Sequence, residues 1–205
     1  MNAQEFVKRL HWLGHDSFRL DGPPVIYFDP WKLKGAQPIA DLVLVSHQHS
    51  DHCSPNDVRK ISGPSTVVIA SPLAAEALPG AKVMRPGDSL SVAGVEVEAV
   101  PAYNITKFRA PGVPFHPRKE EHVGYIVTVD GVRIYFAGDT DHIPEMANFK
   151  CDIALLPVSG TYVMTVEEAV AAAREIKAEI TLPMHYGAGI GGVNDGQRFT
   201  ELLKK

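Results

Sequence analysis

A short apolar strand that leads directly into a cluster of histidines is the feature that most constrains this 205-residue chain. The apolar stretch Leu42 to Ser46 is followed by His47, His49, Asp51 and His52, so one strand end carries three imidazoles and a carboxylate. Imidazole and carboxylate are ligands that suit Zn²⁺ and neighbouring divalent metals. The spacing lets His47 and His49 converge on one ion while Asp51 and His52 reach another. A solvated turn with incidental histidines explains this density less well.

The composition indicates one ordinary globular domain over residues 1–205. Hydrophobic residues make up 45% and charged residues 21% of the chain, so neither disorder nor a fibrous class is indicated. The formal net charge of −4 does not favour nucleic acid as a partner. Cys53 and Cys151 are too few for a disulfide framework, and we expect free thiols, with one bridge between them left open. The N-terminal sequence resembles no secretory signal and no run of about 18 apolar residues occurs, so we expect a cytoplasmic protein without a membrane span.

The order of predicted elements indicates a layered sandwich of strands and helices. Asp130-Gly131 separates two β-rich runs, which is typical of a hairpin. Residues 165–177 form the best helix, because Thr165 and Glu168 make a capping box and apolar residues recur on one face. Residues 101–121 show no clear periodicity, and we expect this long loop to contact substrate. Strands that alternate with helices of this kind suggest sheets covered by outer helices.

Two further strand ends carry potential ligands. The run that ends at Ala137 is followed by Gly138 and Asp139, and the run that ends at Pro183 is followed two residues later by His185. Together with the histidine cluster, these motifs resemble the metallo-β-lactamase superfamily, whose signature is His-x-His-x-Asp-His after a core strand. The resemblance covers about residues 10 to 190. Phrases such as Trp12-Leu13-Gly14-His15 are similar to small hydrolases related to the ascorbate-6-phosphate lactonases.

The resemblance implies both a fold and a ligand set. The fold is an α+β, αββα sandwich of two mixed β-sheets with helices on the outer faces and metals at one edge. In the family, the residue that corresponds to Asp139 bridges the two metals, and the residue that corresponds to His185 completes the second site. The expected cofactors are two divalent ions, Zn²⁺ first, with Mn²⁺, Fe and Ni²⁺ as alternatives. The expected metal ligands are therefore His47, His49, Asp51, His52, His116, Asp139 and His185.

His116 is included because the chain departs from the family pattern at one position. The family offers a histidine to the first metal after the strand between the two main motifs, where this chain has Asn104. An amide oxygen is a weaker zinc ligand than imidazole. His116 and His122 are the candidate replacements, and we prefer His116 because Phe115-His116-Pro117 restrains its backbone.

These features predict a metal-dependent hydrolase that attacks an ester, lactone or phosphodiester bond of a small substrate with a metal-bound hydroxide. We expect Asp51 and His15 to act in catalysis, although a structural hydrogen bond is an equal alternative for His15. A non-catalytic metal-binding protein, or a nuclease acting on short nucleic acids, is the alternative function. A homo-oligomer is compatible with the sequence. Four cations of the long loop could bind a substrate phosphate, although a solvated surface is slightly favoured for them: Lys107, Arg109, Arg118 and Lys119.

Overall fold

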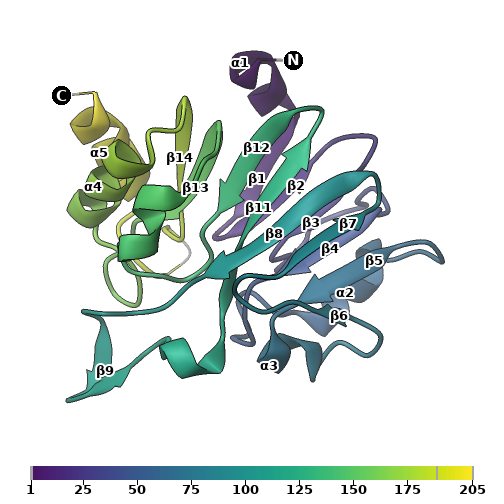
Figure 1. Cartoon of the computed structure of the whole chain (residues 1–205), viewed down its shortest axis with the longest axis horizontal. Helices are drawn as coiled ribbons and strands as arrows, with labels where there is room; N and C mark the ends of the chain where they lie inside the picture. The colour runs from purple at the N-terminus through teal and green to yellow at the C-terminus, as the bar shows by residue number, and fades with distance from the viewer. Residues whose placement is uncertain (1, 188, 205) are drawn as a thin grey trace.

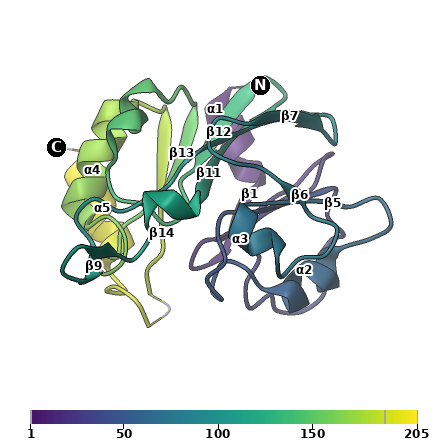
Figure 2. The same cartoon turned by 60° about the horizontal axis from the view of Figure 1, so that its bottom comes forward.

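Two facing β-sheets form the centre of the protein, and helices cover their outer faces. The computed structural model describes residues 2–187 and 189–204. Figure 1 shows the N-terminal sheet beside the C-terminal sheet, and Figure 2 shows α4 and α5 on one outer side and α2 and α3 on the other. This arrangement confirms the predicted α+β sandwich.

The N-terminal sheet has six strands in sequence order. Strands β1 to β3 pair antiparallel, and β3 to β6 pair parallel. Strand β4 is apolar throughout because neighbouring strands flank it on both sides and its residues are buried on both faces. The strands are β1 Leu10–Gly14, β2 Ser17–Leu20, β3 Ile26–Phe28, β4 Leu42–Val45, β5 Val67–Ala70 and β6 Lys82–Val83.

The C-terminal sheet has the strand order β14-β13-β12-β11-β8-β7. Strands β12, β13 and β14 are parallel, and β8 runs in their direction because β11 is antiparallel to both β8 and β12. The carboxyl ends of these four strands therefore meet at one edge. The strands are β7 Ser89–Val92, β8 Val95–Pro101, β11 Val123–Val129, β12 Val132–Phe136, β13 Ile153–Pro157 and β14 Ile180–Met184.

Side-chain hydrogen bonds cap the first turns of two helices. Thr165 and Glu168 form the capping box of α4, and Ser54 accepts a hydrogen bond from Asp57 N at the start of α2. One large core fills the space between the sheets, and a smaller one lies under α2 and α3. No helix among the described residues is long and apolar enough to cross a membrane. The helices are α1 Ala3–Phe6, α2 Pro55–Ile61, α3 Pro72–Ala75, α4 Val166–Ile176 and α5 Asp195–Leu203.

The long segment 101–121 is more ordered than its sequence suggests. It contains a short hairpin of β9 Phe108–Ala110 and β10 Val113–Pro114, followed by a 3₁₀ turn over Arg118–Glu120. Asp141 holds the base of this segment, because its carboxylate accepts hydrogen bonds from the backbone N–H groups of Ile105 and Thr106. Lys107 forms an ion pair with Glu168. The segment is thereby fixed against the edge where the strands end.

Candidate metal centre

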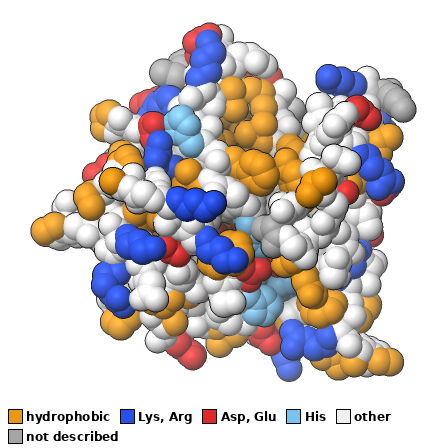
Figure 3. Space-filling model, turned by 180° about the vertical axis from the view of Figure 1, so that it is seen from behind, with side chains coloured by type: hydrophobic (Ala, Val, Ile, Leu, Met, Phe, Trp, Pro, Cys, Tyr) orange, Lys and Arg blue, Asp and Glu red, His pale blue; other side chains and the backbone are white. Residues whose placement is uncertain are grey.

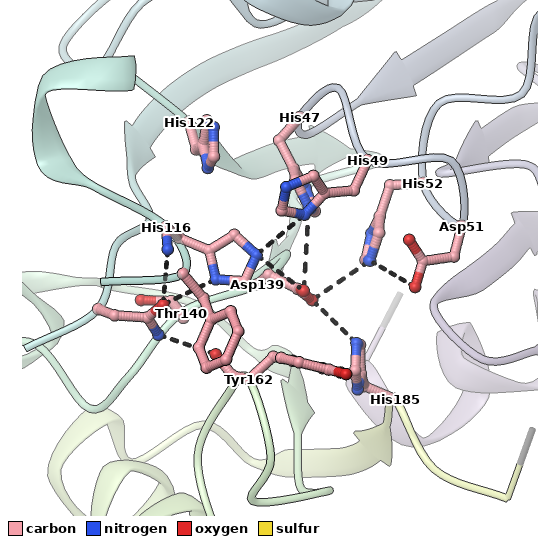
Figure 4. Close-up of polar contacts among 12 residues, drawn as sticks. His47, His49, Asp51, His52, His116, His122, Asp139, Thr140, Tyr162 and His185 are labelled. Atoms are coloured by element: carbon pink, nitrogen blue, oxygen red, sulfur yellow. Dashed lines mark hydrogen bonds and ion pairs between the residues drawn. The ribbon is translucent and has the colours of Figure 1, made fainter. Parts of the chain in front are cut away.

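The strand ends of both sheets bring histidines and aspartates together at one edge. His47, His49 and His52 follow β4, Asp139 follows β12, and His185 follows β14 directly. The turn after β4 is closed because the backbone N–H of His52 donates to the carbonyl of His49 at 3.0 Å. His185 has a left-handed backbone with φ of 58°, which ends the strand at this point. Side chains that lie far apart in the sequence thus converge (Figure 4).

Asp139 lies at the centre of the cluster, and its two oxygens face different groups of imidazoles. Oδ2 lies 3.2 Å from His116 Nε2 and 3.8 Å from His47 Nε2. Oδ1 lies 3.3 Å from His52 Nε2 and 3.4 Å from His185 Nε2. A carboxylate in this position has the geometry to bridge two cations.

The first group consists of His47, His49, His116 and Asp139, whose candidate ligand atoms all lie within 4.8 Å of one another. His49 Nδ1 is 3.0 Å from His47 Nε2 and 3.2 Å from His116 Nε2. Asn104 does not join this group but orients it, because its Oδ1 accepts a hydrogen bond from His116 Nδ1 at 2.8 Å. An amide oxygen only accepts, so the proton of neutral His116 resides on Nδ1 and Nε2 presents its lone pair to the site.

The second group consists of His15, Asp16, His52 and His185, whose candidate ligand atoms also lie within 4.8 Å of one another. Asp29 orients His52, because its Oδ2 accepts a hydrogen bond from His52 Nδ1 at 2.7 Å. His185 Nδ1 lies 2.8 Å from Ser159 Oγ. Both imidazoles therefore turn Nε2 toward Asp139. A carboxylate behind a metal-binding histidine is a common outer partner that fixes its ring.

The electrostatic environment differs between the two groups. Burial, with the charge of His52, holds the pKa of His47 well below its usual value, and burial lowers the pKa of His49. Burial alone would also lower the pKa of His185, but the charges of Asp139 and Asp16 raise it to about 9. His47 and His49 in the first group are therefore neutral imidazoles, whereas His185 in the second group lies beside two carboxylates.

The donor set fits a divalent cation. Several buried side-chain atoms have no hydrogen-bond partner among the described residues, which is costly inside a protein. Those atoms include His52 Nε2, His185 Nε2, Asp139 Oδ1 and both carboxylate oxygens of Asp16. Nitrogen lone pairs and carboxylate oxygens that face one another are all electron donors, and a metal ion satisfies such a set.

Asp51 and His122, two further candidates from the sequence, lie near the cluster but outside the candidate ligand groups of the described residues. Asp51, which the sequence proposed as a metal ligand, belongs to no such group. It lines the cavity, where its Oδ2 is 3.0 Å from His15 Nε2 and 3.9 Å from His52 Nε2. Burial favours a higher pKa for Asp51, but the hydrogen bond from His15 outweighs it and the pKa falls to about 2. His122 is buried near the first group, yet neither of its nitrogens belongs to a candidate ligand group among the described residues.

The sequence interpretation did not identify Asp16 or Asp29 as site residues. Asp29 directly follows strand β3, and an acidic residue at the end of an apolar strand could have indicated a site residue. Asp16 lies in the turn between β1 and β2, and no motif spacing marks it. That turn reaches the site because the backbone N–H of His185 donates to the carbonyl of His15 at 3.2 Å.

A cavity of about 570 Å³ opens beside the metal-ligand cluster. Figure 3 shows histidine atoms at the bottom of a hollow with lysine, arginine and acidic side chains around it. Of the four cations in the long loop, only Arg109 lines this cavity, whereas Lys107 and Arg118 are paired with glutamates. The lining residues are Trp31, His49, Ser50, Asp51, Arg109, Phe115, His116, Asp139, Tyr162 and Ile190.

Comparison with known proteins connects this geometry to a family. Residues 9–185 match the beta-lactamase superfamily domain. A UPF0173 metal-dependent hydrolase of Methanoculleus marisnigri is 36% identical over 185 residues, covering 87% of this chain and 80% of the relative. A relative of the same description from Thermoplasma acidophilum is 34% identical and covers 95% of this chain and 90% of its own.

Solved structures agree with this relationship. The crystal structure of a protein described as a metal-dependent hydrolase from Parabacteroides distasonis has a TM-score of 0.81 and 38% identity, covering 92% of this chain and 87% of that one. A metallo hydrolase from Ignicoccus hospitalis has a TM-score of 0.75 at 22% identity, with coverage of 95% and 89%, and shows the shared fold. The chain is therefore a metal-dependent hydrolase that belongs to the metallo-β-lactamase superfamily.

Proposed function

We propose that this chain uses two divalent cations to hydrolyse an ester, lactone or phosphodiester bond in a small substrate. The observation that carries the proposal is the position of Asp139, whose two oxygens face two separate groups of imidazoles at the edge of a cavity. Zn²⁺ is the first candidate because the first group combines three imidazoles with one carboxylate. His47, His49, His116 and Asp139 would hold one ion, and His52, His185 and Asp139 the other.

Bound divalent metals lower the pKa of a coordinated water toward neutrality and polarise the bond to be cleaved. The protein's own groups prepare for this chemistry. Asn104 and Asp29 keep the Nε2 lone pairs of His116 and His52 directed into the site. Asp51 lies on the cavity wall with a low pKa, so its carboxylate is ionised at neutral pH and can accept a hydrogen bond from a water or from the substrate. His15 supports it by hydrogen bonding to Oδ2.

The cavity favours a small substrate with an apolar body and an anionic group. Its volume of about 570 Å³ lies within the range of small-molecule sites. Phe115 and Tyr162 pack edge to face with ring centroids 4.7 Å apart and form an aromatic wall. The Arg109 guanidinium is held near this wall because it donates to the carbonyl of Phe115 and lies over the Phe115 ring. It is the cavity's cation, and it can pair with a carboxylate or phosphate of the substrate.

A hydrolysis screen tests this function against simple metal binding. Metal-reconstituted and metal-stripped protein should be assayed with bis-p-nitrophenyl phosphate, lactones, carboxylate-bearing aryl esters and nitrocefin. The proposal predicts turnover of at least one ester, lactone or phosphodiester by the reconstituted protein only. Metal binding without turnover of any of these substrate classes would favour a non-catalytic metal-binding role. Cleavage of short oligonucleotides alone would favour the nuclease alternative.

A further inference from the structure

Asp16 is a buried carboxylate for which the protein offers no hydrogen bond. The residue is fully buried, and neither of its oxygens has a hydrogen-bond partner among the described residues. A buried carboxylate without hydrogen bonds is strongly disfavoured unless a positive charge lies beside it. No lysine or arginine of the described residues forms an ion pair with Asp16.

The neighbours of Asp16 are the imidazoles of the second group. Its Oδ2 lies 3.3 Å from His52 Nε2, 3.8 Å from His185 Nε2 and 3.9 Å from His15 Nε2. These separations exceed the 2.7–3.2 Å usual for direct N–H···O hydrogen bonds. Asp139 Oδ1 stands at similar distances, 3.3 and 3.4 Å, from His52 and His185. Asp16 and Asp139 thus both face His52 Nε2 and His185 Nε2 without forming close pairs with them.

Asp16, Asp139, His52 and His185 can all act as electron-pair donors toward a shared cation. Asp29 accepts the Nδ1 proton of His52, which leaves the Nε2 lone pair of the neutral ring directed inward. Ser159 Oγ can accept the Nδ1 proton of His185 in the same way. The other two members are the carboxylates of Asp16 and Asp139.

We propose that Asp16 is a ligand of the second metal ion, which it binds together with His52, His185 and Asp139. This inference rests on the metal-dependent function proposed above and adds a ligand that lies outside the three motifs of the sequence. Asp16 approaches from the β1–β2 turn on the buried side of the cluster, whereas Asp51 lines the cavity on the open side. The second site would then contain two carboxylates and two imidazoles, which differs from the three imidazoles of the first.

Zinc titration of chelator-stripped protein, by calorimetry and by thermal unfolding, tests this assignment without depending on activity. The variant Asp16→Asn keeps the shape of the side chain but removes its charge. We expect it to lose the second zinc equivalent or to bind it at least about ten-fold more weakly, while the first equivalent is retained. The zinc-induced rise in melting temperature should shrink accordingly. Asp16→Ser provides the same test if the asparagine variant does not fold.

Asp57→Asn is the matched control, because Asp57 is also buried but accepts hydrogen bonds from Ser54 and Lys60 away from the site. It should lower the melting temperature equally with and without zinc and leave zinc affinity unchanged. If Asp16→Asn behaves like this control and binds two equivalents with wild-type affinity, Asp16 has a structural role and the inference is wrong. If the wild-type protein itself binds no metal, the proposed function fails together with the inference.

Discussion

Removal of the Asn104 side chain should weaken the first metal site although Asn104 does not belong to it. Its Oδ1 accepts hydrogen bonds from both the backbone N–H and Nδ1 of His116, each at 2.8 Å. In Asn104→Ala both buried donors lose their partner, and each costs about 1–3 kcal/mol, so the free energy of unfolding should fall by about 2–6 kcal/mol. The proton of His116 is then free to move to Nε2, where it blocks the lone pair. Loss of such an outer partner weakens metal binding by about 10–100-fold.

Zinc titration of metal-stripped variants, with urea unfolding in parallel, measures both effects. Asn104→Ala should still bind two equivalents at high zinc concentration, with the first site weakened. His116→Ala should have the larger effect on zinc, losing close to one equivalent. His122→Ala serves as the control and should retain both equivalents, because His122 lies beside the first group without joining it. If Asn104→Ala lost a zinc equivalent and His116→Ala kept both, the amide would be the ligand and the reasoning would be refuted.

Three further changes have defined expected outcomes. Arg109→Ala should raise KM for anionic substrates by about ten-fold or more, because the substrate loses a charge-assisted hydrogen bond. KM for neutral substrates should not change. An equal rise for anionic and neutral substrates would contradict the role of Arg109 in binding an anionic group. Asp139→Asn should abolish metal-dependent hydrolysis with the fold intact by circular dichroism, because an amide cannot bridge two cations as a carboxylate does; full activity would contradict the bridge. Burial raises the pKa of Cys53 to about 11 and of Cys151 to about 12, so Ellman's reagent at pH 8 should react slowly until the protein is unfolded. Rapid labelling of both thiols in the folded protein would contradict these raised pKa values.

The sequence alone predicted the strands that carry obvious alternation or a motif. The hairpin around Asp130-Gly131 and the helix after Thr165 were placed within a residue or so of their observed bounds. The sequence did not predict strands β5 and β13, although Val67–Ala70 and Ile153–Pro157 are apolar runs that each follow a polar residue. Such short runs do not distinguish a buried strand from part of a helix, and only pairing with β4 and β12 decides between them.

The residues of the candidate site also differ in how far the sequence predicts them. His47, His49 and His52 could be predicted because local spacing after one strand brings them together. His116 was predicted only as a replacement for the family's histidine, whose position Asn104 occupies in this chain. The orientation of His116 by Asn104 depends on the fold of the long loop. Asp16 could not be predicted, since the contact between the β1–β2 turn and the end of β14 is set by tertiary packing.

The metal content of the wild-type protein shows whether the cluster around Asp139 is a dinuclear centre. Because the two oxygens of Asp139 face separate groups of imidazoles, the account predicts close to two equivalents of a divalent transition metal per chain. Elemental analysis after mild purification, repeated after reconstitution with zinc, gives the number. A value near two supports the dinuclear centre. A value of one equivalent or less after reconstitution would contradict it.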